Sequence, residues 1–272
     1  MTHDVNSSLS PEEAFLRSNP NSPVIEGQVR ENDSPFKLLQ VVQENGVTTP
    51  AGLPVPFGSF YIAGSESVGD SVIFRPIAAK FKAIARDQDH KVISETGYHD
   101  QVSNKMEDTT GSYGCGRVFG KEAKALSADH QEINKKQADL YLDVFGLVSF
   151  VNEVSGKQLV KLRFRGGKMA RWIEATSDVA DPRLESFKMS TILPKNDPVL
   201  KAKGIKPGNG NYVNLQIARV TDRDLSLTDL MKDGTLVYKY IMDHNKVILE
   251  KYNNSKITTE AFELNDSLDD VM

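Results

Sequence analysis

LYLDVFGLVSFVNEVSGKQLVKLRFR, residues 140–165, is the stretch that decides the fold. It opens with Leu140–Val151, the most hydrophobic run in the chain, which predicts a central strand around which the core is built. In the run Lys157–Arg165 the even positions are apolar: Val160, Leu162 and Phe164. Four of the five odd positions are cationic: Lys157, Lys161, Arg163 and Arg165. Because a strand repeats every two residues, one face should pack and the other should present the cations.

The rest of the chain predicts a mainly β (α+β) protein. From Phe36 onward, short apolar runs are broken by turn residues, which is typical of β structure. In Ser71–Arg86 the odd positions from Ile77 onward are apolar and the even positions include Lys80, Lys82 and Arg86. This alternation favours a strand with a cationic outer face, although the alanines leave a helix open. Lys121–Asp139 and Leu236–Tyr252 are rich in helix-forming residues and predict peripheral helices.

The two ends differ from the body in composition. Residues 1–30 are polar and rich in Pro, Ser and Asn, which predicts a disordered arm. We expect residues 31–253 to form a single domain and residues 254–272 to form a flexible acidic tail. The last sixteen residues contain five carboxylates and no Lys or Arg, and without them the chain carries a formal charge of +1 instead of −4. The tail is therefore a candidate docking peptide and a competitor of nucleic acid for a cationic groove.

Several kinds of chemistry find no support in the sequence. The glycines before Lys121 miss the spacing of a phosphate loop, and the five histidines are scattered without a metal-binding motif. The single cysteine, Cys115, rules out an internal disulfide and fits a reducing cytoplasm. No apolar run approaches the roughly 20 residues that cross a bilayer. We therefore expect a soluble cytoplasmic protein that is not an enzyme and has no cofactor, metal or membrane partner.

The strongest functional signal is a cationic region around one tryptophan. Residues 157–206 contain twelve bases and five acids, and Trp172 lies among them. Single-stranded nucleic acid is bound by cations that follow the phosphates and by aromatic rings that stack on the bases. The residues predicted to bind it are Phe74, Arg75, Lys80, Lys82, Lys161, Arg163, Arg165, Lys168, Arg171 and Trp172, with Phe74 or Trp172 as the stacking ring. A solvated strand face with Trp172 in the core fits the same pattern.

The chain resembles the single-stranded DNA-binding proteins of bacteria and their phages. The resemblance rests on a mostly β body with cationic strands, on the acidic end, and on Cys115-Gly116-Arg117 and Tyr141–Phe150 (YLDVFGLVSF) before a cationic strand. It implies an OB-like β-barrel that coats single-stranded DNA during phage replication or recombination, in the host cytoplasm. It also implies a tail that recruits replication or recombination proteins, through Glu263, Asp266, Asp269, Asp270, Val271 and Met272. The ending Val271-Met272 departs from the Pro-Phe or Phe that closes such tails, which puts the tail's receptor in doubt.

Other functions remain open on the sequence alone. The second hypothesis is a phage structural or assembly protein, whose cationic strands would face acidic surfaces of neighbouring subunits. A third is a nucleic-acid enzyme in which dispersed carboxylates hold magnesium, although the sequence singles out no such carboxylate. Whether the chain forms a homo-oligomer is also undecided.

Overall fold

The computed structural model describes residues 34–43, 45–151, 156–202, 204, 212–220 and 227–269, with side chains of the last segment from 232 to 257. The chain divides into two units, Met1–Phe36 and Lys37–Met272. The predicted arm, residues 1–30, lies outside the described residues, as do Asp270, Val271 and Met272. Everything below concerns the second unit.

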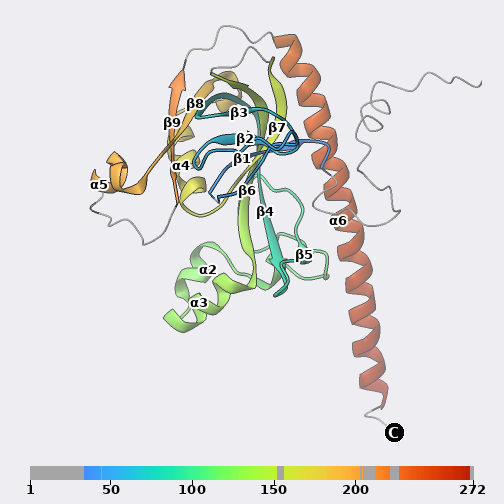
Figure 1. The fold of residues 1–272 in the computed structure, drawn as a ribbon. Coiled ribbons are helices and arrows are strands. Elements are labelled where there is room, and N and C mark those ends of the chain that lie inside the picture. The colour runs from blue at the N-terminus through green and yellow to red at the C-terminus, as the bar shows by residue number, and fades with distance from the viewer. Residues whose placement is uncertain are drawn as a thin grey trace, which may run out of the picture. The chain divides into compact units, whose positions relative to one another are not determined.

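A curled sheet of nine strands forms a half-barrel in the described part of this unit, together with a few helices (Figure 1). The strands are β1 (Lys37–Val41), β2 (Phe60–Ile62), β3 (Val68–Gly69), β4 (Ser71–Arg86), β5 (Val92–Glu95), β6 (Asp139–Phe150), β7 (Gln158–Phe164), β8 (Ser186–Ile192) and β9 (Asn214–Val220). Their order across the sheet is β3-β2-β1-β7-β6-β4-β8-β9, and β5 pairs with β4. The helices are α2 (Gly120–Ala125), α3 (Ala128–Gln137), α4 (Gly167–Thr176), α5 (Pro198–Ala202) and α6 (Leu227–Asp269). Three short 3₁₀ turns are η2 (Gly114–Gly116), η3 (Pro182–Leu184) and η4 (Pro194–Asn196).

The long strand β4 organises the sheet. It pairs with β6 along its whole length, while its other edge pairs first with β8 and then with β5. The register with β6 shifts between Pro76 and Ala78, because proline has no N–H to donate to the ladder. Gly146 faces this irregularity, where a Cβ would lie 2.3 Å from the carbonyl oxygen of Arg75. Ser71–Arg86 is thus a strand and not a helix.

The core lies inside the curl of the sheet, and Trp172 of α4 is at its centre. The Trp172 ring centroid is 5.8 Å from that of Phe74, 5.5 Å from that of Phe164 and 5.4 Å from that of Phe187. The apolar positions predicted for β7 point into this core, and Val160, Leu162 and Phe164 are all buried. The period-2 pattern in Lys157–Arg165 therefore identified the inward face correctly.

Two helical predictions need correction. The predicted helix Lys121–Asp139 is two helices, because Ser127 interrupts it and caps α3 by accepting a hydrogen bond from the His130 N–H. α6 does not end at Tyr252 but continues to Asp269, because residues 253–269 contain no Gly or Pro to stop it. Residues 254–269 of the predicted tail are therefore part of this helix. No described helix is both long and apolar enough to cross a membrane.

Candidate nucleic-acid interface

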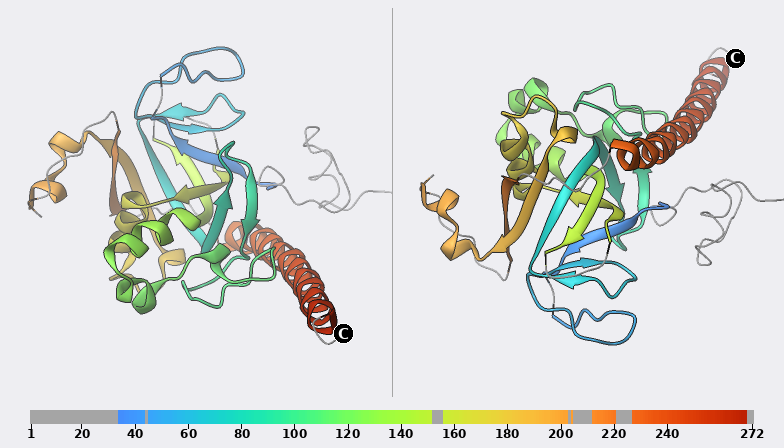
Figure 2. Two further views of the ribbon diagram at one scale, coloured as in Figure 1. Left: turned by 90° about the horizontal axis from the view of Figure 1, so that it is seen from below. Right: turned by 90° about the horizontal axis from the view of Figure 1, so that it is seen from above.

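The outer face of β4, β6 and β7 carries the charges that the sequence placed there, but it is not open to solvent. Lys82, Asp143, Lys161 and Arg163 all come from strand positions opposite the core. Lys82 is only 2% exposed and Lys161 only 5%. Part of this covering comes from α6, which lies beside the sheet (Figure 2), and part from Tyr98, which follows β5. The prediction of a solvent-facing row of cations on β7 is therefore wrong for Lys161.

Asp143 and Arg163 form a bidentate ion pair beneath this cover. Arg163 donates from Nε to Oδ1 at 2.7 Å and from Nη2 to Oδ2 at 2.6 Å. The Tyr98 hydroxyl donates to Asp143 Oδ2 at 3.1 Å. Burial raises the pKa of Asp143, which the charges of Lys161 and Lys82 oppose, and burial lowers the pKa of Arg163 to about 10. The guanidinium of Arg163 is thus committed to an internal carboxylate rather than offered to a phosphate.

Lys82 is held in a second buried pair, with Glu95 and His244. Its Nζ lies 2.6 Å from Glu95 Oε2 and 3.0 Å from His244 Nε2. Because an ammonium group can only donate, Nε2 must accept and the imidazole hydrogen must sit on Nδ1. Nδ1 is buried and has no hydrogen-bond partner in the described part of the chain. Burial, reinforced by the charge of Lys82, lowers the pKa of His244 to about 2, so the ring is neutral at ordinary pH.

α6 is fixed over this face by specific contacts. The Asn245 side chain bonds both polar groups of the Tyr98 backbone: Oδ1 accepts from the N–H at 2.6 Å and Nδ2 donates to the carbonyl oxygen at 2.9 Å. The Tyr240 ring packs 5.9 Å from that of Phe145. The Tyr238 hydroxyl donates to the carbonyl oxygen of Ile77 at 3.3 Å. In this conformation the outer face of β6 and β7 has no room for a nucleic-acid strand.

The remaining predicted residues on β4 and β7 are also engaged within the protein. Phe74 is fully buried and Trp172 is 3% exposed, so neither ring offers a free face on which a base could stack. Arg75 donates to the carbonyl oxygen of Arg183 at 3.0 Å. The last two predicted residues form partly exposed ion pairs within the protein: Lys80 with Asp100 at 2.5 Å and Arg165 with Asp139 at 2.7 Å. The alternative with Trp172 as a core residue is therefore the correct one.

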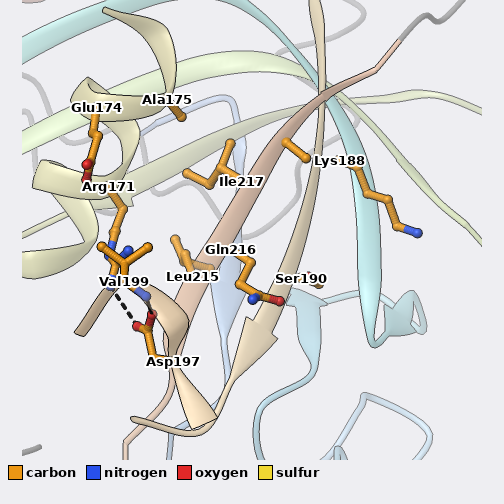
Figure 3. Close-up of a pocket in the computed structure, with 11 residues that line it drawn as sticks. Arg171, Glu174, Ala175, Lys188, Ser190, Asp197, Val199, Leu215, Gln216 and Ile217 are labelled. Carbon is orange, nitrogen blue, oxygen red and sulfur yellow. Dashed lines mark hydrogen bonds and ion pairs between the residues drawn. The ribbon is translucent and has the colours of Figure 1, made fainter. Parts of the chain in front are cut away.

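An open groove of about 530 Å³ lies on the other side of the half-barrel, along the edge strand β9 (Figure 3). We call it the β9 groove; its lining residues are Arg171, Glu174, Ala175, Lys188, Ser190, Asp197, Val199, Leu215, Gln216, Ile217 and Ala218. Arg171 Nη2 donates to Asp197 Oδ2 at 2.7 Å, and Asn214 Nδ2 reaches the same oxygen at 2.7 Å. Asp197 also accepts from the N–H of Val199 at 2.9 Å, which fixes the start of α5.

Among the residues that line the β9 groove, Lys188 is the cation whose side chain is exposed. It is exposed on β8, and its ammonium group points away from the pair of Arg171 and Asp197 (Figure 3). Lys195 and Lys201 are exposed on the connection from β8 to β9 that borders the groove. Lys168, which begins α4, lines a neighbouring pocket of about 240 Å³, and burial lowers its pKa. Cations thus gather here from three separate segments.

The sequence of β8 carries a signal for this groove. In β8 the exposed or half-exposed Lys188 and Ser190 alternate with the buried Phe187 and Met189. This period-2 pattern is typical of a strand with one buried and one outward face. The sequence of β7 shows the same alternation of apolar and cationic residues.

Two further observations concern side chains that could bind a metal or act as a nucleophile. No three His, Cys, Asp or Glu side chains gather there in a way that could hold a metal ion. Burial raises the pKa of the Cys115 thiol to about 11. Comparisons with protein-family models, curated proteins and solved structures find nothing that matches this chain. The function must therefore be argued from the fold and the groove.

Proposed function

We propose that the protein is a non-enzymatic single-stranded DNA-binding protein built on an OB-like half-barrel. The observation that carries the proposal is the order of elements β4-β6-β7-α4-β8-β9 together with their pairing. The long first strand pairs with both the second and the fourth, and the fifth forms an antiparallel pair with the fourth. An OB-fold is a five-stranded, partly open Greek-key barrel of this kind, and it commonly binds oligonucleotides.

The half-barrel is more open than a closed five-stranded barrel. β1 takes the place beside β7 and pairs with it in parallel, so β9 has β8 as its only strand partner in the described sheet. The edge of β9 borders the open groove. This opening supplies a concave surface at the end of the half-barrel formed by β8 and β9, the fourth and fifth strands of the OB-like order.

The β9 groove is the surface we propose for the nucleic acid. OB-folds bind strands over their second and third strands and with the loops that follow the first and fourth. Here Tyr98 and α6 cover the outer face of β6 and β7, whereas the loop after β8 borders the groove. Phosphates would contact Lys188, Lys201 and the exposed edge of Arg171. Because no aromatic side chain lines the groove in the described residues, binding should depend strongly on salt.

The proposed cellular role follows the resemblance seen in the sequence. The protein would coat single-stranded DNA during phage replication or recombination, in the host cytoplasm. The acidic residues at the end of the chain would recruit replication or recombination proteins. Three of them, Glu263, Asp266 and Asp269, belong to the last turns of α6, so we expect a partner to recognise a helix.

Fluorescence anisotropy of a labelled oligothymidine strand tests the proposal, at about 50 mM and about 200 mM salt. We expect saturable binding that weakens steeply with salt. Lys188→Glu and Lys201→Glu should each weaken binding several-fold, and each lost phosphate contact should reduce the salt slope by about 0.7. Lys121→Glu on α2 makes the same charge change on an exposed lysine away from the groove and should have little effect.

Two different failures are distinguishable. If no saturable binding occurs at low salt, the proposed function is wrong, and the second hypothesis, a phage structural or assembly protein, accounts for that result. If binding is strong but the variants in the β9 groove behave like Lys121→Glu, the DNA lies elsewhere. In that case the covered outer face of β6 and β7 becomes the candidate, and binding would require α6 to move.

A further inference from the structure

Between 232 and 257, where its side chains are described, α6 has two apolar faces, of which one packs on the body. The inward face buries Val237, Ile241, Ile248 and Tyr252. The outward face exposes large apolar side chains: Met242 (71%), Leu249 (48%) and Ile257 (64%). A helix that only rested against its own body would have a polar outer face. The outward face is therefore a candidate contact surface.

α6 also extends beyond its own body. The last contacts with the body that we can describe involve Ser255, which donates to the carbonyl oxygen of Thr109 at 3.1 Å, and Lys256, whose backbone nitrogen lies close to Gly111. The helix continues from there to Asp269, which at 1.5 Å per residue is about 20 Å. Figure 1 shows this end running away from the sheet. Helical segments of this length are marginal in water unless something packs against them.

Along the sequence of α6, apolar positions are symmetric about Asn253. Leu249 and Ile257 lie four residues before and after it, and Met242 and Leu264 lie eleven before and after. Steps of eleven residues are close to three full helical turns, so these positions form one nearly straight stripe along α6. A stripe with this symmetry becomes complementary to itself when a second copy runs in the opposite direction.

We infer that two copies of this chain form an antiparallel homodimer through α6, with the two-fold axis at Asn253. A two-fold interface requires that residue i contacts residue j and that j contacts i, which is the relation that these pairs of positions satisfy. Met242 then meets Leu264 of the second copy, and Leu249 meets Ile257. The exposed Asn253 meets itself, and a polar residue at one such position fixes register at some cost in stability.

The charges along the stripe favour the same arrangement. Lys246 and Glu260 lie seven residues on either side of Asn253, so each lysine would face a glutamate of the other copy, twice in the dimer. Lys246 is exposed on its own body. From 257 to 269 α6 carries four carboxylates and no base, whereas between 227 and 256 five lysines stand against four carboxylates. A parallel pair would instead set the acidic ends side by side, which like-charge repulsion disfavours.

Sedimentation equilibrium of the full chain, at tens of micromolar or so, measures the dimer directly. We expect twice the chain mass of 30.1 kDa, and a shift to the single mass for Leu249→Glu and Ile257→Glu. Ile133→Glu is the matched control, because Ile133 is 54% exposed on α3, away from the stripe, and should leave the dimer intact. A native chain that sediments as a monomer would overturn the inference.

Charge reversal tests the register without changing the apolar surface. Lys246→Glu and Glu260→Lys should each raise the dissociation constant several-fold, because two ion pairs become like-charge contacts. The double variant restores both pairs and should recover most of the affinity. If the double variant is as weak as the sum of the two single variants, these positions do not meet and the register is wrong.

Cysteine cross-linking tests the direction of the helices. Asn253→Cys places two thiols at the axis, where a disulfide between copies should form. In an antiparallel pair two copies of Leu264→Cys lie about 33 Å apart and should not cross-link, whereas in a parallel pair both variants should. The native chain, with only the buried Cys115, is the control. Cross-linking of both variants would refute the antiparallel arrangement. None of these measurements depends on DNA binding.

Discussion

Replacing Lys82 by Met should strongly destabilise the fold, because it would leave the Glu95 carboxylate buried without a counter-charge. The side chains of Lys82 and Glu95 are 3% and 7% exposed, and their charged atoms are 2.6 Å apart. Removing one partner of a buried pair costs about 3–5 kcal/mol, most of it the desolvation of the charge left behind. We expect Lys82→Met to lower the free energy of unfolding by that amount. The loss of the Lys82 contact to His244 adds about 1 kcal/mol.

The double variant separates the penalty of an orphaned charge from the value of the pair itself. Glu95→Leu alone should also be destabilising, because it leaves the Lys82 ammonium buried beside His244. With Lys82→Met and Glu95→Leu together, no unpaired charge remains, and replacing a whole buried pair by apolar groups is often close to neutral. The double variant should therefore be more stable than either single variant, so the effects should be far from additive.

Urea unfolding followed by the fluorescence of Trp172 measures these free energies, because the chain has one tryptophan and it is buried. The chain concentration must be held fixed, since dimerisation would contribute to stability. Lys135→Met is the control: it breaks an exposed pair with Glu132 and should have no measurable effect. A loss below about 1 kcal/mol for Lys82→Met, or additive effects in the double variant, would refute this account of the pair.

Three further predictions follow from local geometry. The pKa of His244 is about 2 in the folded chain and near 6.5 in the unfolded chain, so the free energy of unfolding should fall as pH drops below about 6.5. His244→Gln should remove about 2 kcal/mol of the loss between pH 7 and pH 5. His130→Gln, at an exposed position, is the control and should not reduce this loss. Gly146→Ala should destabilise by about 3 kcal/mol in urea unfolding, since its Cβ would overlap the Arg75 carbonyl; wild-type stability would contradict the close approach. Cys115, with a pKa of about 11, should react slowly with a thiol reagent in the native chain and rapidly in urea; equal rates would contradict its burial.

The sequence predicted the strands well where apolar and charged side chains alternate, although the charged face proved to be covered. The alternation in Lys157–Arg165 and in Ser71–Arg86 identified β7 and β4, and the inward side chains of β7 are those expected. The helix ends were less predictable. Nothing in the local pattern at Tyr252 marks a continuation, although the lack of Gly and Pro after it permits one.

The sequence could not show which cations would be free. Lys161 and Arg163 look alike along the chain, yet Lys161 is buried and Arg163 is bound to Asp143, twenty residues away. Trp172 lies among cations in the sequence and among Phe74, Phe164 and Phe187 in the fold. Such partners come from distant segments, so composition within a window of fifty residues cannot reveal them.

The sequence by itself determined the mainly β body, the inward face of β7, the concentration of acid at the end of the chain and the spacing of apolar residues along α6. Local chemistry suffices for these, because strand and helix periods are properties of neighbouring residues. The tertiary structure decided that α6 lies over the cationic face, that Trp172 fills the core, and that the open groove lies along β9. The physical reason is that burial and ion pairing depend on which distant segments meet, and only the folded chain brings those segments together.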